Sequence, residues 1–302
     1  QDLMQFTAED DEELPDGLNA KVAIEKLREL KDRDEPFFMG LGFYKPHLPF
    51  VAPKQDWDAV KDIPAPDAPH PDKPDSNYGS TSGEFFRYNM PFEKTRPLNS
   101  ESRMQARRAY WACVRYVDRQ VGRVLTALNE LGLRDNTIVV VWGDHGWHLG
   151  DGEMWAKHVA HERALKSTLI VHVPGLHQSG SISNAIVQTT DLYPTLVDLC
   201  NLKDTKTEFP LDGRSLRSVL DGSRSKLHDS VVGYWRNSES IRNEHYRLIA
   251  SRTRNGFENI ELYDLRTTRD PLNNIADKHP QVVKQLLSEF PETSIHGRSA
   301  TR

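Results

Sequence analysis

The residues best suited to chemistry follow an apolar run near the middle of the chain. Asp144 and His145 follow Val139–Trp142 after a single glycine, and Lys157 lies a short way downstream. A buried parallel strand that delivers Asp and His at its carboxyl end is where α/β enzymes place their catalytic groups. Asp144 is a hard ligand suited to Ca²⁺ or Mg²⁺, and His145 either completes the shell or holds an anion oxygen. Lys157 suits an oxygen of a sulfate or phosphate group.

A second lysine and histidine follow another apolar segment. The run 36–43 is short, aromatic and apolar, which is typical of a buried strand, and it is followed by Lys45 and His47. The prolines on either side of His47 stiffen the backbone and would preorganise the imidazole to protonate a leaving group. Lys45 is a candidate second cation. The alternatives are a histidine held for loop rigidity, a solvated lysine, and an Asp144 that merely caps a turn.

The remaining histidines and the two cysteines have simpler interpretations. Most of four further histidines lack the spacing of a zinc site, and we do not predict one there. The four are His148, His158, His161 and His172. Cys113 and Cys200 both fall in helical patterns, which predicts two buried structural thiols.

The periodicity of the chain predicts an α/β region followed by a small antiparallel subdomain. Helical spacing covers 20–30 and 101–131, and a strand is expected at 169–173. Eight of the 18 prolines lie in 53–97, which we expect to be a loop insertion near the active-site face. After about residue 222 only short strand patterns and a terminal helix appear. We therefore expect domains at 1–222 and 223–302, with strands at 231–235, 246–250 and 260–265 and a helix at 282–290.

Composition excludes several classes of protein. The 302 residues carry a formal charge of −5, which argues against general binding to nucleic acid or to membrane surfaces. No apolar run approaches the length needed to cross a bilayer. Because the chain opens at Gln1 without an initiator Met, we expect that an upstream segment has been removed or was never included.

Several of these segments together resemble the type I sulfatases, in particular the branch similar to iduronate 2-sulfatase. The resemblance runs from about residue 35 to 280, in the order that the family uses. Its motifs are Lys45-Pro46-His47-Leu48-Pro49, Gly143-Asp144-His145-Gly146-Trp147-His148-Leu149-Gly150, Trp155-Ala156-Lys157, Asp191-Leu192-Tyr193-Pro194-Thr195, Leu211-Asp212-Gly213-Arg214-Ser215-Leu216 and Leu262-Tyr263-Asp264-Leu265. The resemblance implies an alkaline-phosphatase-like fold, with part of a large mixed sheet and a small C-terminal antiparallel subdomain.

The resemblance also implies roles for single residues. Asp144 resembles the calcium-ligand Asp of the family, and His145 resembles the neighbouring ligand. Lys157 resembles the lysine that contacts the sulfate group. His47 resembles the histidine that touches sulfate and protonates the leaving alkoxide. The turn Asp151-Gly152-Glu153-Met154 departs from the relatives, which usually read Glu-His-Gly-x, and this puts turn shape and specificity in doubt.

The family's nucleophile is missing from these residues. It is a formylglycine made from the Cys or Ser of a Cys/Ser-x-Pro-x-Arg motif, and neither Cys113 nor Cys200 lies in one. The early Asp pair that supplies further calcium ligands is also missing. We therefore expect the C-terminal portion of a sulfatase, inactive by itself and completed by an N-terminal segment.

The expected whole enzyme is a Ca²⁺-dependent sulfuric ester hydrolase that acts on a sulfated sugar or polysaccharide. The resemblance implies a periplasmic, secreted or lysosome-like location for it. Two alternatives stay open. One is a phosphomonoesterase or phosphodiesterase of the same superfamily, and the other is a homologue that binds sulfated glycans without catalysis.

Overall fold

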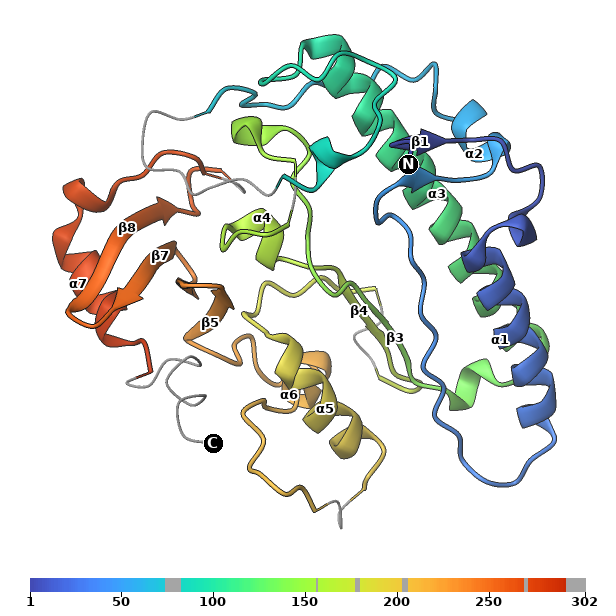
Figure 1. Ribbon diagram of the computed structural model, residues 1–302. Helices are drawn as coiled ribbons and strands as arrows, with labels where there is room; N and C mark the ends of the chain where they lie inside the picture. The colour runs from blue at the N-terminus through green and yellow to red at the C-terminus, as the bar shows by residue number, and fades with distance from the viewer. Residues whose placement is uncertain (74–82, 156, 177–179, 203–205, 269–270, 292–302) are drawn as a thin grey trace. The chain divides into compact units, whose positions relative to one another are not determined.

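A computed structural model describes residues 1–73, 83–155, 157–176, 180–202, 206–268 and 271–291, which form two compact units (Figure 1). The first unit holds the described residues of Gln1–Lys73, Ser82–Val139 and His148–Ala156. The second unit holds those of Pro74–Thr81, Val140–Trp147 and Lys157–Arg302. None of the described helices combines the length and the apolar character that a bilayer span needs.

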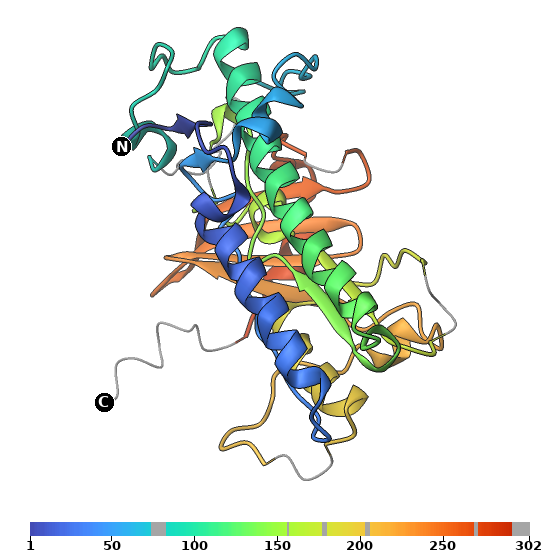
Figure 2. The same ribbon diagram turned by 90° about the vertical axis from the view of Figure 1, so that its right-hand side faces the viewer.

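The first unit is organised around two long helices that lie side by side in both views (Figures 1 and 2). Its main elements are β1 (Met4–Gln5), η1 (Asp11–Glu13), α1 (Pro15–Lys31), β2 (Phe50–Val51), α2 (Lys54–Asp58), η2 (Phe85–Arg87), α3 (Ser100–Glu130), η3 (Arg134–Asn136) and η4 (Asp151–Glu153). Strands β1 and β2 pair in parallel. The helices predicted at 20–30 and 101–131 are confirmed.

The buried face of α3 is not the face that carries valines at spacings of three and four residues, which are Val114, Val117, Val121 and Val124. Ala106, Ala109 and Ala112 are fully buried, whereas Val114 is 39% exposed. Spacings of three and four residues occur on both faces, so periodicity alone did not select between them. Small side chains suit a close approach of two helices, and α3 packs along α1.

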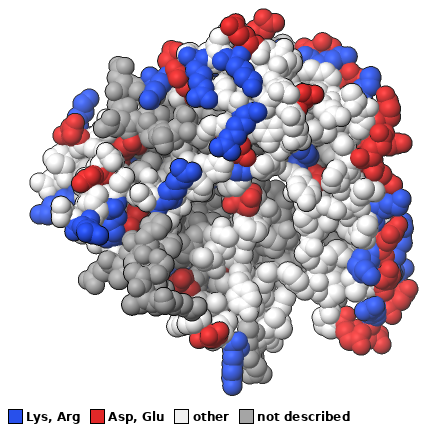
Figure 3. All heavy atoms as spheres, viewed as in Figure 1, with Lys and Arg blue, Asp and Glu red and all other residues white. Residues whose placement is uncertain are grey.

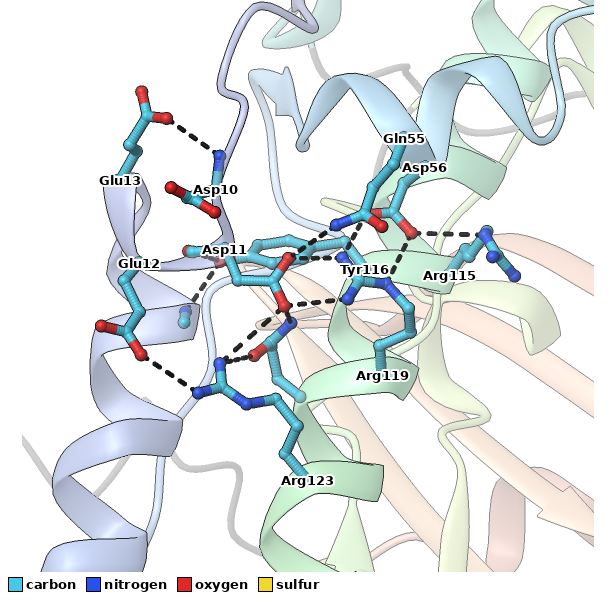
Figure 4. A network of polar contacts seen from close by, with 12 residues as sticks. Asp10, Asp11, Glu12, Glu13, Gln55, Asp56, Arg115, Tyr116, Arg119 and Arg123 are labelled. Atoms are coloured by element: carbon cyan, nitrogen blue, oxygen red, sulfur yellow. Dashed lines mark hydrogen bonds and ion pairs between the residues drawn. The ribbon is translucent and has the colours of Figure 1, made fainter.

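A polar network joins the start of the first unit to α3 (Figure 4). Arg119 donates to both carboxylate oxygens of the fully buried Asp56, at 2.9 and 2.7 Å, and to Asp11 at 2.8 Å. Burial alone would raise the pKa of Asp11, but hydrogen bonds from Arg119 and Gln120 hold it below its usual value. Although Asp11 lies in the acidic run 9–13, its carboxylate is therefore paired and not simply solvated.

The apolar run 36–43 does not form the buried strand that we predicted. The structure assigns it no strand, and the Phe38 side chain is 84% exposed. A strand requires hydrogen-bonding partners on a neighbouring strand, and the described residues pair none with this segment. The prediction is wrong for this structure because composition indicates what a strand would bury but supplies no partner.

The second unit contains one small sheet near the candidate site and one larger sheet. Its elements include β3 (Val139–Trp142, from Val140 on), α4 (Glu162–Leu165), β4 (Leu169–His172), η5 (Thr189–Asp191), α5 (Leu192–Leu199), α6 (Arg217–Leu220) and η6 (Ala276–Lys278). Strands β3 and β4 are hydrogen-bonded neighbours, so the strands predicted after residue 138 and at 169–173 are both present. They are not fully buried, since Trp142 is 46% and Ile170 is 58% exposed.

The C-terminal antiparallel sheet is confirmed. Strands β5 (Ser230–Trp235), β6 (Ser238–Asn243), β7 (Tyr246–Thr253) and β8 (Gly256–Asp264) pair in chain order. Helix α7 (Pro280–Ser288) packs on the sheet through a shared apolar core. That core contains Ile241, Leu248, Ala250, Leu262, Leu286 and Phe290. The predicted domain division at residue 222 stays a prediction.

The two cysteines differ in their surroundings. Cys113 is buried, and burial raises the pKa of its thiol to about 12. Cys200 is exposed, so the prediction of two buried thiols is wrong for this residue. Helix α5 has only eight residues, and Cys200 sits at its carboxyl end.

Candidate functional site

The loop after β3 follows a path set by backbone contacts. The N–H of Gly143 donates to the carbonyl of Thr168 at 2.9 Å, which extends the contact between β3 and β4. The N–H of Gly146 donates to Ala164 at 2.9 Å, and a Cβ at position 146 would lie 1.8 Å from the carbonyl oxygen of Arg163. Only glycine fits this close approach to α4. The loop is therefore held between β4 and α4, with the two predicted metal ligands between its glycines.

Asp144 and His145 lie together at the surface of this loop. The side chain of Asp144 is 78% exposed and that of His145 is 32% exposed. The His145 Nδ1 lies 2.7 Å from the carbonyl oxygen of Gly146, and its Nε2 lies 3.4 Å from Asp144 Oδ2. Because a carbonyl only accepts, the neutral ring carries its proton on Nδ1 and turns the Nε2 lone pair toward the carboxylate. Two electron-rich atoms so placed attract a cation.

The donor set fits Ca²⁺ only in part. A carboxylate is a preferred calcium ligand, whereas an imidazole nitrogen is unusual, and six to eight oxygens are typically needed. Among the residues that the structure describes, no three His, Cys, Asp or Glu side chains gather into a metal-binding group. Asp144 and His145 are therefore suited to one side of a shell and do not complete it.

Lys157 is held against the same loop. Its Nζ lies 5.5 Å from the ring centroid of Trp147, which ends the loop, in a cation–π arrangement. The side chain is half-buried, so the ammonium is partly shielded from water. The second unit thus brings Lys157 next to the end of the Asp144–His145 loop, and its role as a sulfate ligand stays a prediction. Ala156, between Trp155 and Lys157 in the motif, lies outside the described residues.

Lys45 and His47 belong to the first unit, in a turn anchored by a buried carboxylate. Asp16 is 1% exposed and accepts from the backbone N–H groups of Tyr44 and Lys45, at 2.8 and 2.9 Å. The Lys45 ammonium donates to the carbonyl oxygens of His47 and Pro49, at 2.9 and 2.8 Å. Burial lowers the pKa of Lys45. These bonds use two of its three N–H groups to hold the turn, and its contact with an anion stays a prediction.

The His47 ring is positioned much as that of His145 is. Its Nδ1 lies 2.7 Å from the carbonyl oxygen of Leu48, and its Nε2 lies 3.9 Å from Glu84 Oε1. The side chain is 42% exposed. A proton on Nε2 would therefore be both accessible to a leaving group and near a carboxylate, which suits a general acid.

Two side chains that sequence reasoning did not select, Trp235 and Arg236, are joined by ring contacts to His158, the residue after Lys157. His158 stacks on Trp235, with ring centroids 4.8 Å apart, and the Arg236 guanidinium lies 5.6 Å from the centroid of the same indole. The sequence signal was weak. It consisted of a tryptophan and an arginine at a strand end, and only the fold brings β5 to residue 158.

Comparisons with known proteins assign the family. The sulfatase family model matches residues 4–202, about two thirds of the chain. The chain belongs to the sulfatase family. A second family model, described as N-sulphoglucosamine sulphohydrolase, C-terminal, matches residues 143–295. The resemblance found in the sequence is thereby confirmed.

Individual relatives of this sulfatase chain support the same family assignment. It is 30% identical to a sulfatase of Formosa agariphila over 292 residues, covering 95% of this chain and 55% of that protein. It is 32% identical to human iduronate 2-sulfatase over 227 residues, covering 63% of this chain and 40% of the human protein. The chain spans about half the length of the curated relatives it matches.

The fold also matches solved structures. A protein whose structure is in complex with its substrate D-glucosamine-2-N,6-O-disulfate superposes with a TM-score of 0.76 at 21% identity, covering 94% of this chain and 70% of that one. This likeness confirms the sulfatase and alkaline-phosphatase-like fold class, with its C-terminal antiparallel sheet of four strands.

Proposed function

We propose that this chain supplies the sulfate-binding and calcium-binding side of an enzyme that hydrolyses sulfate esters of sugars. The observation that carries the proposal is the arrangement around the β3 loop. There, Lys157 rests on Trp147 and the exposed Asp144–His145 pair shares the same loop. The sulfated sugars named for the relatives, an iduronate 2-sulfate among them, support the substrate class.

Each site residue has a distinct part in this proposal. Lys157 binds a sulfate oxygen as a point charge, and His47 donates a proton from Nε2 to the leaving alkoxide. Lys45 holds the turn of His47 and stands as a second candidate contact for the anion. Asp144 and His145 hold Ca²⁺ on one side, and the bound ion would neutralise charge on the sulfate.

The rest of the centre would come from outside these 302 residues. We propose that the formylglycine nucleophile and the remaining calcium ligands belong to another part of the full-length protein. The incomplete donor set at Asp144 supports this, as does the coverage of only 55% of the length of the Formosa agariphila sulfatase. A periplasmic, secreted or lysosome-like location would suit such an enzyme.

Hydrolysis of an aryl sulfate by the full-length protein tests the proposal. Lys157→Ala should lower kcat/KM by about 10²–10³-fold, the scale found when one electrostatic contact to a transition state is removed. Lys166→Ala is the matched control, because Lys166 is an exposed lysine of the same unit. An aryl phosphate turned over faster than the aryl sulfate would instead support a phosphoesterase. Binding of sulfated sugars without turnover would support a non-catalytic homologue.

A further inference from the structure

The turn between β5 and β6 carries an arginine where turn geometry does not favour one. Trp235 pairs with Ser238, so the loop consists of Arg236 and Asn237. Arg236 has a φ of 51°, in the left-handed region that two-residue hairpin turns usually fill with Gly or Asn. Non-glycine residues in such conformations cluster at functional sites. Backbone geometry alone therefore does not explain why an arginine occupies this turn.

The Arg236 side chain is joined to the candidate site by two ring contacts. The guanidinium lies over the half-buried Trp235 indole, and that indole stacks on His158 with an interplanar angle of 28°. His158 directly follows Lys157, the predicted sulfate ligand. The contact between Trp235 and His158 thus brings the tip of a C-terminal hairpin to the segment that carries Lys157, within the second unit.

Two cations of the second unit are therefore held on aromatic rings, and the two rings contact successive residues, Lys157 and His158. Lys157 rests on Trp147, and Arg236 rests on Trp235. An ammonium acts as a point charge, whereas a guanidinium offers a planar pair of N–H groups that matches a carboxylate or a sulfate. Arg236 is exposed at the tip of the hairpin, so a ligand in solution can reach its guanidinium.

We propose that Arg236 binds a second anionic group, a carboxylate or a second sulfate, on the sugar whose sulfate ester is bound by Lys157. Trp235 and His158 position the guanidinium. This inference rests on the proposed function and makes Arg236 a specificity-determining residue. Sugars with two anionic groups are then favoured over sugars with one.

Affinities of the full-length, calcium-loaded protein for three ligands test the inference. The ligands are N-acetylglucosamine 6-sulfate with one anionic group, D-glucosamine-2-N,6-O-disulfate with two sulfates, and an iduronate 2-sulfate with a carboxylate. Titration gives Kd where mass spectrometry finds the ligand intact, and initial rates give kcat/KM where it is hydrolysed. Arg236→Gly removes the guanidinium and suits the left-handed backbone. Arg254→Gly is the matched control, an exposed arginine in the β7–β8 turn of the same sheet.

Arg236→Gly should reduce the preference for a two-anion ligand over the one-anion ligand by about tenfold, as loss of one charge-assisted contact implies. Arg254→Gly should leave that preference unchanged, and Arg236→Lys should restore part of it. A loss with the disulfate alone identifies a second sulfate, and a loss with the uronate alone identifies a carboxylate. An unchanged preference, or an equal loss with all three ligands, overturns the inference. Failure of the proposed function is seen separately, as absent hydrolysis of the aryl sulfate.

Discussion

At the scale of single residues, two histidines of the candidate site share the same hydrogen-bonding geometry. In both His145 and His47, Nδ1 lies 2.7 Å from the backbone carbonyl of the next residue. This contact selects the tautomer and aims Nε2 outward, next to a carboxylate in each case. The same local geometry suits a metal ligand in the loop of Asp144 when the ring is neutral, and a proton donor in the turn of Lys45 when both ring nitrogens are protonated. The difference in role comes from the neighbours.

Calcium should stabilise the full-length protein through Asp144. An ion that binds only the folded state adds about 2.7 kcal/mol to the free energy of unfolding when present at 100 times its Kd. Asp144→Ala should abolish most of this gain, because it removes the only carboxylate of the loop pair. The measurement is the Tm with calcium and with a chelator. The exposed Asp212→Ala, in the same unit, serves as the control. An equal rise of Tm in both variants would contradict a role for Asp144.

At the scale of elements, a buried titratable pair joins α4 to the C-terminal sheet. His161 precedes α4, and its Nε2 lies 4.0 Å from Oε2 of Glu261 on β8. Tyr263 donates a hydrogen bond to Glu261 at 2.7 Å. Burial raises the pKa of Glu261 to about 7, whereas burial and the nearby charge of Arg247 lower the pKa of His161 to about 3. Both side chains are therefore held in their neutral forms between these values.

The two shifts should oppose each other in the pH dependence of stability. Glu261, raised from 4.5, costs stability as the pH rises from about 4.5 to 7, because the unfolded state loses its proton first. His161, lowered from 6.5, costs stability as the pH falls from 6.5 to about 3. Between about 4.5 and 6.5 the two effects offset.

Single variants should expose the two slopes. Relative to the wild type, Glu261→Gln should gain stability with rising pH between about 4.5 and 6.5, and His161→Gln should lose it. Each slope should approach 1.4 kcal/mol per pH unit, the value for one proton. Urea unfolding at pH 4.5, 5.5 and 6.5 measures the difference. Three parallel curves would show that neither group is perturbed by burial.

At the scale of the whole molecule, the surface carries charges of both signs and also several exposed large apolar side chains. On the face in Figure 3, Lys and Arg side chains lie among Asp and Glu side chains. The strands near the candidate site nevertheless expose Trp142 and Ile170 to solvent, and Phe38 is exposed in the first unit. Contiguous apolar surface is typical of faces that another segment covers, and Trp142 and Ile170 lie on the neighbouring strands β3 and β4.

The 302-residue chain alone should not hydrolyse an aryl sulfate, whereas the full-length protein should. The physical reason is that the described donors supply only one side of a calcium shell and the sequence contains no Cys/Ser-x-Pro-x-Arg motif. The assay compares both proteins with calcium present, after circular dichroism has shown that the short chain is folded. Calcium-dependent turnover by the short chain would place the nucleophile among these 302 residues.

The sequence by itself determined what depends on local chemistry. The spacing of apolar residues predicted α3 and the C-terminal strands, and the order of short motifs predicted the sulfatase family. The types of Asp144, His145 and Lys157 indicated an anion and metal site, because each type has few chemical uses. These features need only a residue and its near neighbours along the chain.

Only the tertiary structure decided what depends on partners distant in sequence. Periodicity did not reveal which face of α3 is buried, nor that the run 36–43 pairs with no strand in the described residues. It also gave no sign that Trp235 and Arg236 lie beside His158, because β5 is far from that residue along the chain. Burial, strand pairing and ring stacking are properties of two surfaces in contact. These properties are therefore decided by the contact between two segments and not by the sequence of either segment alone.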